Sequence, residues 1–152
     1  MTELIQIVTA AIGSLCFGLL FNLRDKKLIA VTACGGIGWL IFILLDRLFE
    51  EEFLCYFFVA LLISLSAEIL ARFMKSPTTV FIAPALIPLV PGSSLYYTMA
   101  NALSGNTELF AEKAIDTLTY AAALAVGVIS AAVLMQMLLR LPAVWRKKHE
   151  HE

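Results

Sequence analysis

The sequence predicts an all-α, polytopic membrane protein with about five transmembrane helices. Of its 152 residues, 61% are hydrophobic and 15% are charged, whereas soluble domains average about 45–50% and 25%. The charged residues gather in short segments that separate long uncharged runs. Each run is close to the length of about 20 apolar residues that a helix needs to cross a bilayer. We therefore expect residues 1–152 to form a single integral membrane domain.

The uncharged runs define the expected elements in chain order. The spans cover about residues 4–23, 28–45, 53–71, 77–103 and 114–139, and a tail follows at residues 140–152. The chain starts without the basic segment of a signal peptide, so we expect the first span to be a retained helix. Three spans carry small residues that let helices approach closely. These are Ala10, Ser14 and Gly18 in the first span, Gly35, Gly36 and Gly38 in the second, and Ala123, Gly127 and Ala131 in the fifth.

The basic residues predict how the chain is oriented. In a five-span layout nine of the eleven basic residues fall on one side of the membrane, and only Arg47 and Lys113 fall on the other. Basic loops stay in the cytoplasm. We therefore expect a multi-pass protein of the cell membrane with its N-terminus outside and its C-terminus in the cytoplasm. A four-span layout, with the fourth segment re-entrant, stays open but separates the basic residues less well.

Three prolines mark the middle of the fourth expected span. Pro84, Pro88 and Pro91 share one helical face, and Gly92 follows them directly. A proline in a helix interior removes one backbone hydrogen bond and costs about 3 kcal/mol relative to alanine. We expect these four residues to break the span into two half-helices.

The flanking residues predict where the half-helices begin. Ser76 and Pro77 have the pattern of a helix start, with serine as the cap and proline at the first position. Ser93 or Ser94 is expected to cap the second half-helix. The carbonyl groups that the prolines leave unpaired are those of Val80, Pro84 and Ile87.

A broken helix in a bilayer favours a transport function. Irregular backbone is tolerated there only against protein or a water-filled cavity, and many transporters build substrate sites from such breaks. The alternative is a proline kink that only shapes the bundle. The candidate substrate-binding residues are Pro84, Pro88, Pro91, Gly92, Ser93, Ser94, Tyr97 and Asn101.

Glu68, in the last turn of the third span, is a candidate for proton coupling. An ionisable residue within a membrane span is a functional hypothesis by default. Arg72 follows four residues later, so the alternative is a simple ion pair on one helix face. Trp39 and Trp145 are interpreted as interfacial anchors or packing residues. The histidines of the tail, His149 and His151, lack a fixed scaffold, and we expect no metal site.

Two segments resemble a known family. "SPTTVFIAPALIPLVPGSSLYYTM", residues 76–99, resembles the proline-rich signature of the membrane half of the threonine/serine exporter family. "FGLLFNLRDKKLIAVTACGGIGW", residues 17–39, is similar to the first two helices of that half. The resemblance implies a subunit of a secondary-active inner-membrane exporter of small amino acids or small carboxylates. It also implies a large-subunit membrane partner, or self-association, because full-length members carry two membrane halves.

Other classes of function find less support in the sequence. There is no Gly-x-Ser-x-Gly or His-Glu-x-x-His motif, and the aspartates lie at span edges, so we do not expect an enzyme. A net charge of −1 gives no footprint for nucleic acid, and no cofactor is implied. A non-catalytic subunit that stabilises a transporting partner stays open as the alternative.

Overall fold

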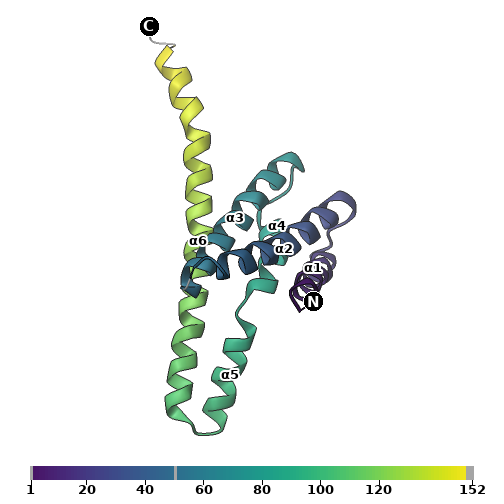
Figure 1. The fold of residues 1–152 in the computed structure, drawn as a ribbon. Coiled ribbons are helices and arrows are strands. Elements are labelled where there is room, and N and C mark those ends of the chain that lie inside the picture. The colour runs from purple at the N-terminus through teal and green to yellow at the C-terminus, as the bar shows by residue number, and fades with distance from the viewer. Residues whose placement is uncertain (1, 50, 150–152) are drawn as a thin grey trace.

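The computed structural model describes residues 2–49 and 51–149 of the chain, with side chains described through residue 139. Within these residues every element is helical (Figure 1). The elements are α1 (Thr2–Leu20), α2 (Asp25–Asp46), α3 (Glu52–Phe73), α4 (Thr79–Leu86), the 3₁₀ helix η1 (Ile87–Leu89), α5 (Gly92–Leu103) and α6 (Thr107–His149).

The predicted fold class is confirmed. Among the described residues, α1, α2, α3 and the part of α6 up to Leu139 are each long and apolar enough to cross a membrane. The segments Thr79–Leu89 and Gly92–Leu103 pass the same test together and bend by 56° at the break between them. The chain therefore has four candidate spans, or five if the bent pair is one span.

The small residues of the first two spans form the contact between α1 and α2. Ala10, Ser14 and Gly18 are buried on one face of α1, and Gly35 and Gly36 are buried on α2. A methyl group at Gly35 would overlap Ser14, and one at Gly36 would lie 3.2 Å from Cβ of Ala11. The two helices thus run antiparallel at a distance that only small residues permit.

The small face of α6 packs on α3. A Cβ at Gly127 would lie 2.6 Å from the carbonyl oxygen of Phe57, and Ala123 and Ala131 are fully buried. Tyr56 and Tyr120 stack with their ring centroids 4.8 Å apart. Later residues of α3 are matched by later residues of α6, so the two helices run parallel.

Three helices end in the same backbone motif, and it sets their lengths. After α1, Asn22 has a φ of 57°, and the N–H of Leu23 donates to the carbonyl of Gly18 at 2.9 Å. Lys75 after α3 and Gly105 after α5 take the same left-handed conformation, each followed by an equivalent bond. Such Schellman motifs pair carbonyls that a helix end would otherwise leave unsatisfied.

The start of the fourth span differs from the sequence prediction. α4 begins at Thr79, and Thr78 rather than Ser76 holds the cap position. The Ser76 hydroxyl instead donates to the carbonyl of Met74 at 3.2 Å. The difference arises because the motif that ends α3 occupies Lys75 and Ser76, so the next helix cannot begin until the chain has turned.

The connections define two ends of the bundle. Leu23, Ala71 and Phe81 share one buried cluster, which places the α1–α2 and α3–α4 connections together. We call this the basic end, because it carries Arg24, Lys26, Lys27, Arg72 and Lys75. At the opposite, acidic end, an ion pair joins Glu3 of α1 to Arg47, the residue that follows α2.

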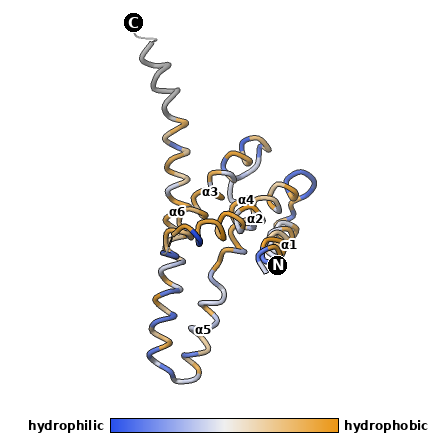
Figure 2. Tube along the Cα trace, viewed as in Figure 1, coloured by the Kyte–Doolittle hydropathy of each residue, from blue (hydrophilic) through white to orange (hydrophobic). Residues whose placement is uncertain are grey.

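A helical hairpin of α5 and the first part of α6 extends from the bundle at the acidic end (Figure 1). Thr98 and Thr117 link its two arms, with their hydroxyl oxygens 3.2 Å apart. Pale and blue colours at its turn mark a polar tip (Figure 2). The bent pair therefore runs from the basic end to the acidic end.

Candidate functional site

The broken span consists of three short pieces. Pro84 lies inside α4, Pro88 inside η1, and Pro91 at the position before α5. The chain turns at Val90, whose ψ of 128° is extended rather than helical. The expected break is thus present, at the residues that the sequence indicated.

Two details of the expected break are wrong. α5 begins at Gly92 with Pro91 in the cap position, so neither Ser93 nor Ser94 caps it. The Ile87 carbonyl is not free, because it accepts the N–H of Val90 at 3.1 Å. In a regular α-helix the Ile87 carbonyl would accept the N–H of the residue four positions later, but that residue is Pro91, which has no N–H. The 3₁₀ turn instead pairs the carbonyl with the N–H of Val90, three positions later.

The break lies near the middle of the bundle. Leu89 is buried beside Gly38 and Ile63, which lie in the middle portions of α2 and α3. Pro88 faces Gly13, near the centre of α1, where an added Cβ would lie 3.8 Å from Cγ of the proline. The irregular backbone is therefore at mid-depth, where hydrocarbon cannot satisfy its polar groups.

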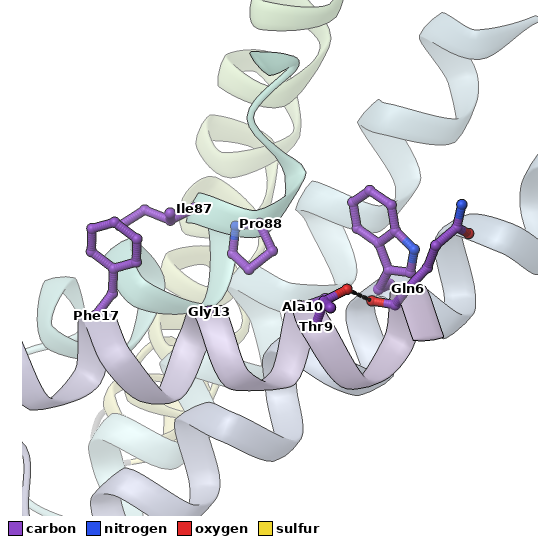
Figure 3. Close-up of a pocket in the computed structure, with 8 residues that line it drawn as sticks. Gln6, Thr9, Ala10, Gly13, Phe17, Ile87 and Pro88 are labelled. Atoms are coloured by element: carbon purple, nitrogen blue, oxygen red, sulfur yellow. Dashed lines mark hydrogen bonds between the residues drawn. The ribbon is translucent and has the colours of Figure 1, made fainter. Parts of the chain in front are cut away.

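A cavity of about 300 Å³ lies between α1 and the break (Figure 3). Pro88 and Ile87 stand over α1 in this view, with Phe17 and Gln6 towards its two ends (Figure 3). The lining is mostly apolar. It consists of Gln6, Thr9, Ala10, Gly13, Phe17, Trp39, Ile87 and Pro88.

A second cavity, of about 350 Å³, lies towards the acidic end. It is lined by Thr2, Glu3, Gln6, Trp39, Phe42, Ile43, Asp46 and Arg47. Gln6 and Trp39 line both cavities. We call the two together the α1–α2 cleft, with its floor at Pro88 and its mouth at the ion pair of Glu3 and Arg47.

Few polar groups face the apolar floor of the cleft. The Thr9 hydroxyl is engaged by its own helix, at 2.8 Å from the carbonyl oxygen of Ile5 and 2.9 Å from that of Gln6. The indole N–H of Trp39 is buried and has no hydrogen-bond partner among the described residues. The mouth, by contrast, carries charges of both signs.

The structure brings one of the predicted substrate-binding residues, Pro88, into the cleft. Pro84 and Pro91 are buried, whereas Gly92, Ser93 and Tyr97 are exposed on the break and on α5. Ser94 is half-buried, and its carbonyl accepts the Thr98 hydroxyl. Asn101 lies at the α5–α6 turn, where its carbonyl accepts the N–H of Asn106 at 3.1 Å. These residues do not converge on one cavity within this chain.

The proton-coupling candidate has a partner at the basic end. An Arg72 guanidinium nitrogen lies 3.5 Å from a Glu68 carboxylate oxygen, and the two side chains are 46% and 19% exposed, respectively. Glu68 does not line the α1–α2 cleft. The geometry fits the ion pair expected from their spacing, and proton coupling stays a prediction.

Sequence reasoning missed the residues of α1 and α2 that line the cleft. Gln6, Thr9 and Gly13 recur at helical spacing on one face of α1, but this polar face was not separated from the neighbouring small-residue face. Trp39 was interpreted as an anchor or packing residue. It does pack, with its ring centroid 5.5 Å from that of Phe42, but it also lines the cleft.

A bundle of apolar helices with one segment broken near its middle beside a cavity has the architecture of a multi-pass membrane transporter. The chain belongs to the threonine/serine exporter family, since the family model described as "Threonine/Serine exporter, ThrE" matches residues 6–134. This is a family of transporters and not of enzymes, so a transport function follows at the family level. No curated protein and no solved structure matches the chain.

Proposed function

We propose that this chain is the small subunit of a secondary-active exporter in the cell inner membrane. Its substrates are small amino acids of the threonine and serine type, or small carboxylates. Family membership supports transport in general, and the broken span beside the cleft supports a direct role of this chain in substrate binding. The proposed substrate-binding residues are Pro84, Pro88, Pro91, Gly92, Ser93, Ser94, Tyr97 and Asn101, with Glu68 as the proton-coupling residue.

A large-subunit membrane partner, or a second copy of the chain, completes the proposed transporter. α5 packs chiefly on α6, and a Cβ at Gly92 would meet nothing within 4 Å. The first N–H groups of a helix lack acceptors within it, and an unpaired N–H in hydrocarbon is expensive. The Gly92 N–H is already bonded to the Val90 carbonyl at 2.6 Å, so a second chain, or a water-lined path between two chains, would serve the next N–H group, that of Ser93.

The alternative role is a non-catalytic subunit that stabilises a transporting partner. The small-residue faces do not distinguish the two roles, because they are already used between α1 and α2 and between α3 and α6. The feature that favours the transporting role is the position of the break, with Pro88 on the floor of the cleft. A purely assembling subunit would use the break only to shape the bundle and would not need it beside a cavity.

The test is transport by the purified complex of this chain with its large-subunit partner in proteoliposomes. We expect movement of labelled L-threonine, L-serine or succinate that depends on an imposed proton or sodium gradient. The decisive variants are Ser93→Ala and Tyr97→Phe, which leave the fold in place. Loss of transport per assembled complex supports the substrate-binding role, and unchanged transport in both supports the assembly role.

A further inference from the structure

The two parts of the α1–α2 cleft meet at Gln6 and Trp39. These two side chains line both parts and therefore lie between the charged mouth and the floor at Pro88. The floor part, of about 300 Å³, is at the small end of ligand pockets, which run from about 300 to 1,000 Å³. The floor part thus suits a small ligand.

Trp39 lines the cleft, and its indole N–H, which lies beneath the cleft surface, has no partner in the described part of the fold. Its indole nitrogen can only donate a hydrogen bond, and it is buried without an acceptor among the described residues. Most buried polar groups in proteins are paired, and an unpaired one calls for a ligand, a water molecule or a functional reason. Gln6 is exposed and lines the cleft beside this tryptophan, so its side chain can change rotamer to admit an acceptor.

We propose that the α1–α2 cleft is a substrate-binding path and that the Trp39 N–H donates to a carboxylate or hydroxyl oxygen of a small amino acid held there. This inference rests on the proposed function, because it assigns a binding contact to the proposed transporter. The proposed substrate-binding residues lie in the broken span, whereas this contact comes from Trp39 of α2, and α1 forms the opposite wall of the cleft.

The charges at the mouth suit a ligand that bears both signs. Glu3, Asp46 and Arg47 line this part, and Arg47 is already paired with Glu3. Two carboxylates against one guanidinium leave the mouth net negative, which disfavours an anion such as a dicarboxylate and tolerates a zwitterion. A zwitterionic amino acid also brings the oxygen acceptors that the Trp39 N–H lacks.

Trp39 is held firmly enough to present its N–H in one direction. Its ring packs on Phe42, which packs on Tyr56 with centroids 4.9 Å apart, and Tyr56 stacks on Tyr120. This aromatic row ties the wall of the cleft to α3 and α6. Replacing Trp39 by phenylalanine keeps an aromatic ring in the row and removes the N–H.

The binding test follows the Trp39 N–H itself. The chain is labelled with ¹⁵N at its tryptophan indoles and assembled with the unlabelled large subunit, so that its two tryptophans give the only indole signals. Trp145→Phe assigns the Trp39 signal. We expect L-threonine to move the Trp39 N–H proton signal downfield in a saturable way and to leave the Trp145 signal in place. No shift at saturating L-threonine, or a shift that is equal for both tryptophans, would overturn the proposal.

The transport test compares the same substitution at two positions. We expect Trp39→Phe to raise KM for L-threonine by about tenfold or more, the loss typical of a hydrogen bond to a charged group. Trp145→Phe should leave KM unchanged, and complex yield should be equal for both. An unchanged KM in Trp39→Phe overturns the role of Trp39 even while the transporter works. If the complex moves no L-threonine at all, the proposed function fails. The indole signal of Trp39 then still decides whether the cleft binds L-threonine.

Discussion

Gly13 of α1 and Pro88 of η1 face each other across the floor of the cleft, and a Cβ at Gly13 would lie 3.8 Å from Cγ of the proline (Figure 3). This is an ordinary van der Waals distance, so an alanine fits there. A longer side chain at Gly13 would instead extend into the cavity beneath the break. The pair therefore provides a way to fill the cleft without altering the prolines.

We expect Gly13→Ala to transport normally and Gly13→Leu to lose transport by about tenfold or more, because the leucine occupies space that a concave site reserves for its ligand. Complex yield should be similar for both, since the leucine fills a cavity rather than a packed interface. Gradient-driven uptake of L-threonine per assembled complex is the measurement. Ile12→Leu on the exposed side of α1 is the control. Wild-type turnover in Gly13→Leu would place the transport path elsewhere.

Two glycines predict opposite responses to the same substitution. A Cβ at Gly127 would lie 2.6 Å from the Phe57 carbonyl oxygen and 2.8 Å from Cβ of Ala60, whereas a Cβ at Gly92 would meet nothing within 4 Å. We expect Gly127→Ala to destabilise the packing of α3 on α6 by about 1–3 kcal/mol through overpacking. Gly92→Ala should leave the melting temperature of the purified chain unchanged or raise it slightly. Equal melting temperatures for both variants would contradict the close packing of α3 and α6.

The positions of the spans were predictable because lipid imposes a length and a composition on each one. The helix break was predictable for a related reason, since three prolines and a glycine in one span leave the backbone few alternatives. Its details were not: the capping of α5 and the pairing of the Ile87 carbonyl depend on a 3₁₀ turn that forms around Pro88. Local hydrogen bonding decides between such turns, and sequence spacing alone does not.

The last helix begins earlier than the charge pattern predicts. The expected span began at residue 114, because Glu108, Glu112 and Lys113 precede it, but α6 begins at Thr107. The Asn106 side chain accepts the N–H of Leu109 at 3.3 Å and so caps the helix. The 33 residues up to Leu139 correspond to about 50 Å of helix against a core of about 30 Å. The charged first turns therefore belong to the hairpin beyond the acidic end rather than to the bilayer.

The cleft could not be predicted from the sequence. It is formed by the consecutive helices α1 and α2 together with η1, which is distant from both in the chain. Trp39 is placed in it by the close approach of α1 and α2. A search for polar residues at helical spacing could have found Gln6 and Thr9. It would not have found the unpaired N–H of Trp39, because that property exists only once the helices are packed.

Glu68 gives a prediction about energy coupling. If this residue carries a coupling proton, Glu68→Gln abolishes gradient-driven transport while the complex stays assembled. If it only pairs with Arg72, the change is small, because an exposed helix ion pair contributes roughly 0.3–0.5 kcal/mol. The two outcomes separate in proteoliposomes with and without a pH gradient, and Arg72→Gln removes the same ion pair from the other side as a control. Full gradient-driven activity in Glu68→Gln would eliminate the proton-carrier role.

The basic end gives a prediction about orientation. Arg24, Lys26, Lys27, Arg72 and Lys75 gather there, so we expect this end in the cytoplasm. A reporter that is active only in the cytoplasm should therefore work when fused after Glu152 and fail when fused before Met1. A reporter active only outside should give the reverse pattern. Two termini on the same side would exclude the layout of five crossings.

The prolines themselves give the sharpest test of the proposed function. Replacing Pro88 and Pro91 by alanine restores two N–H donors and lets the helix continue, which favours a helix by up to about 3 kcal/mol per proline in a host peptide. If the break builds the substrate site, we expect a complex that assembles with wild-type yield but transports little, because the irregular backbone beside the cleft is gone.

A kink that only shapes the bundle leads to a different result for the same double variant. The straightened segment would no longer follow the path from α4 to α5, so assembly would fail, and activity would fall only in proportion to complex yield. Transport per assembled complex distinguishes the two, with Pro77→Ala, outside α4 and the break, as the control. Wild-type turnover per complex in the double variant would show that the break is scaffolding, and the substrate site would then have to lie away from Pro88.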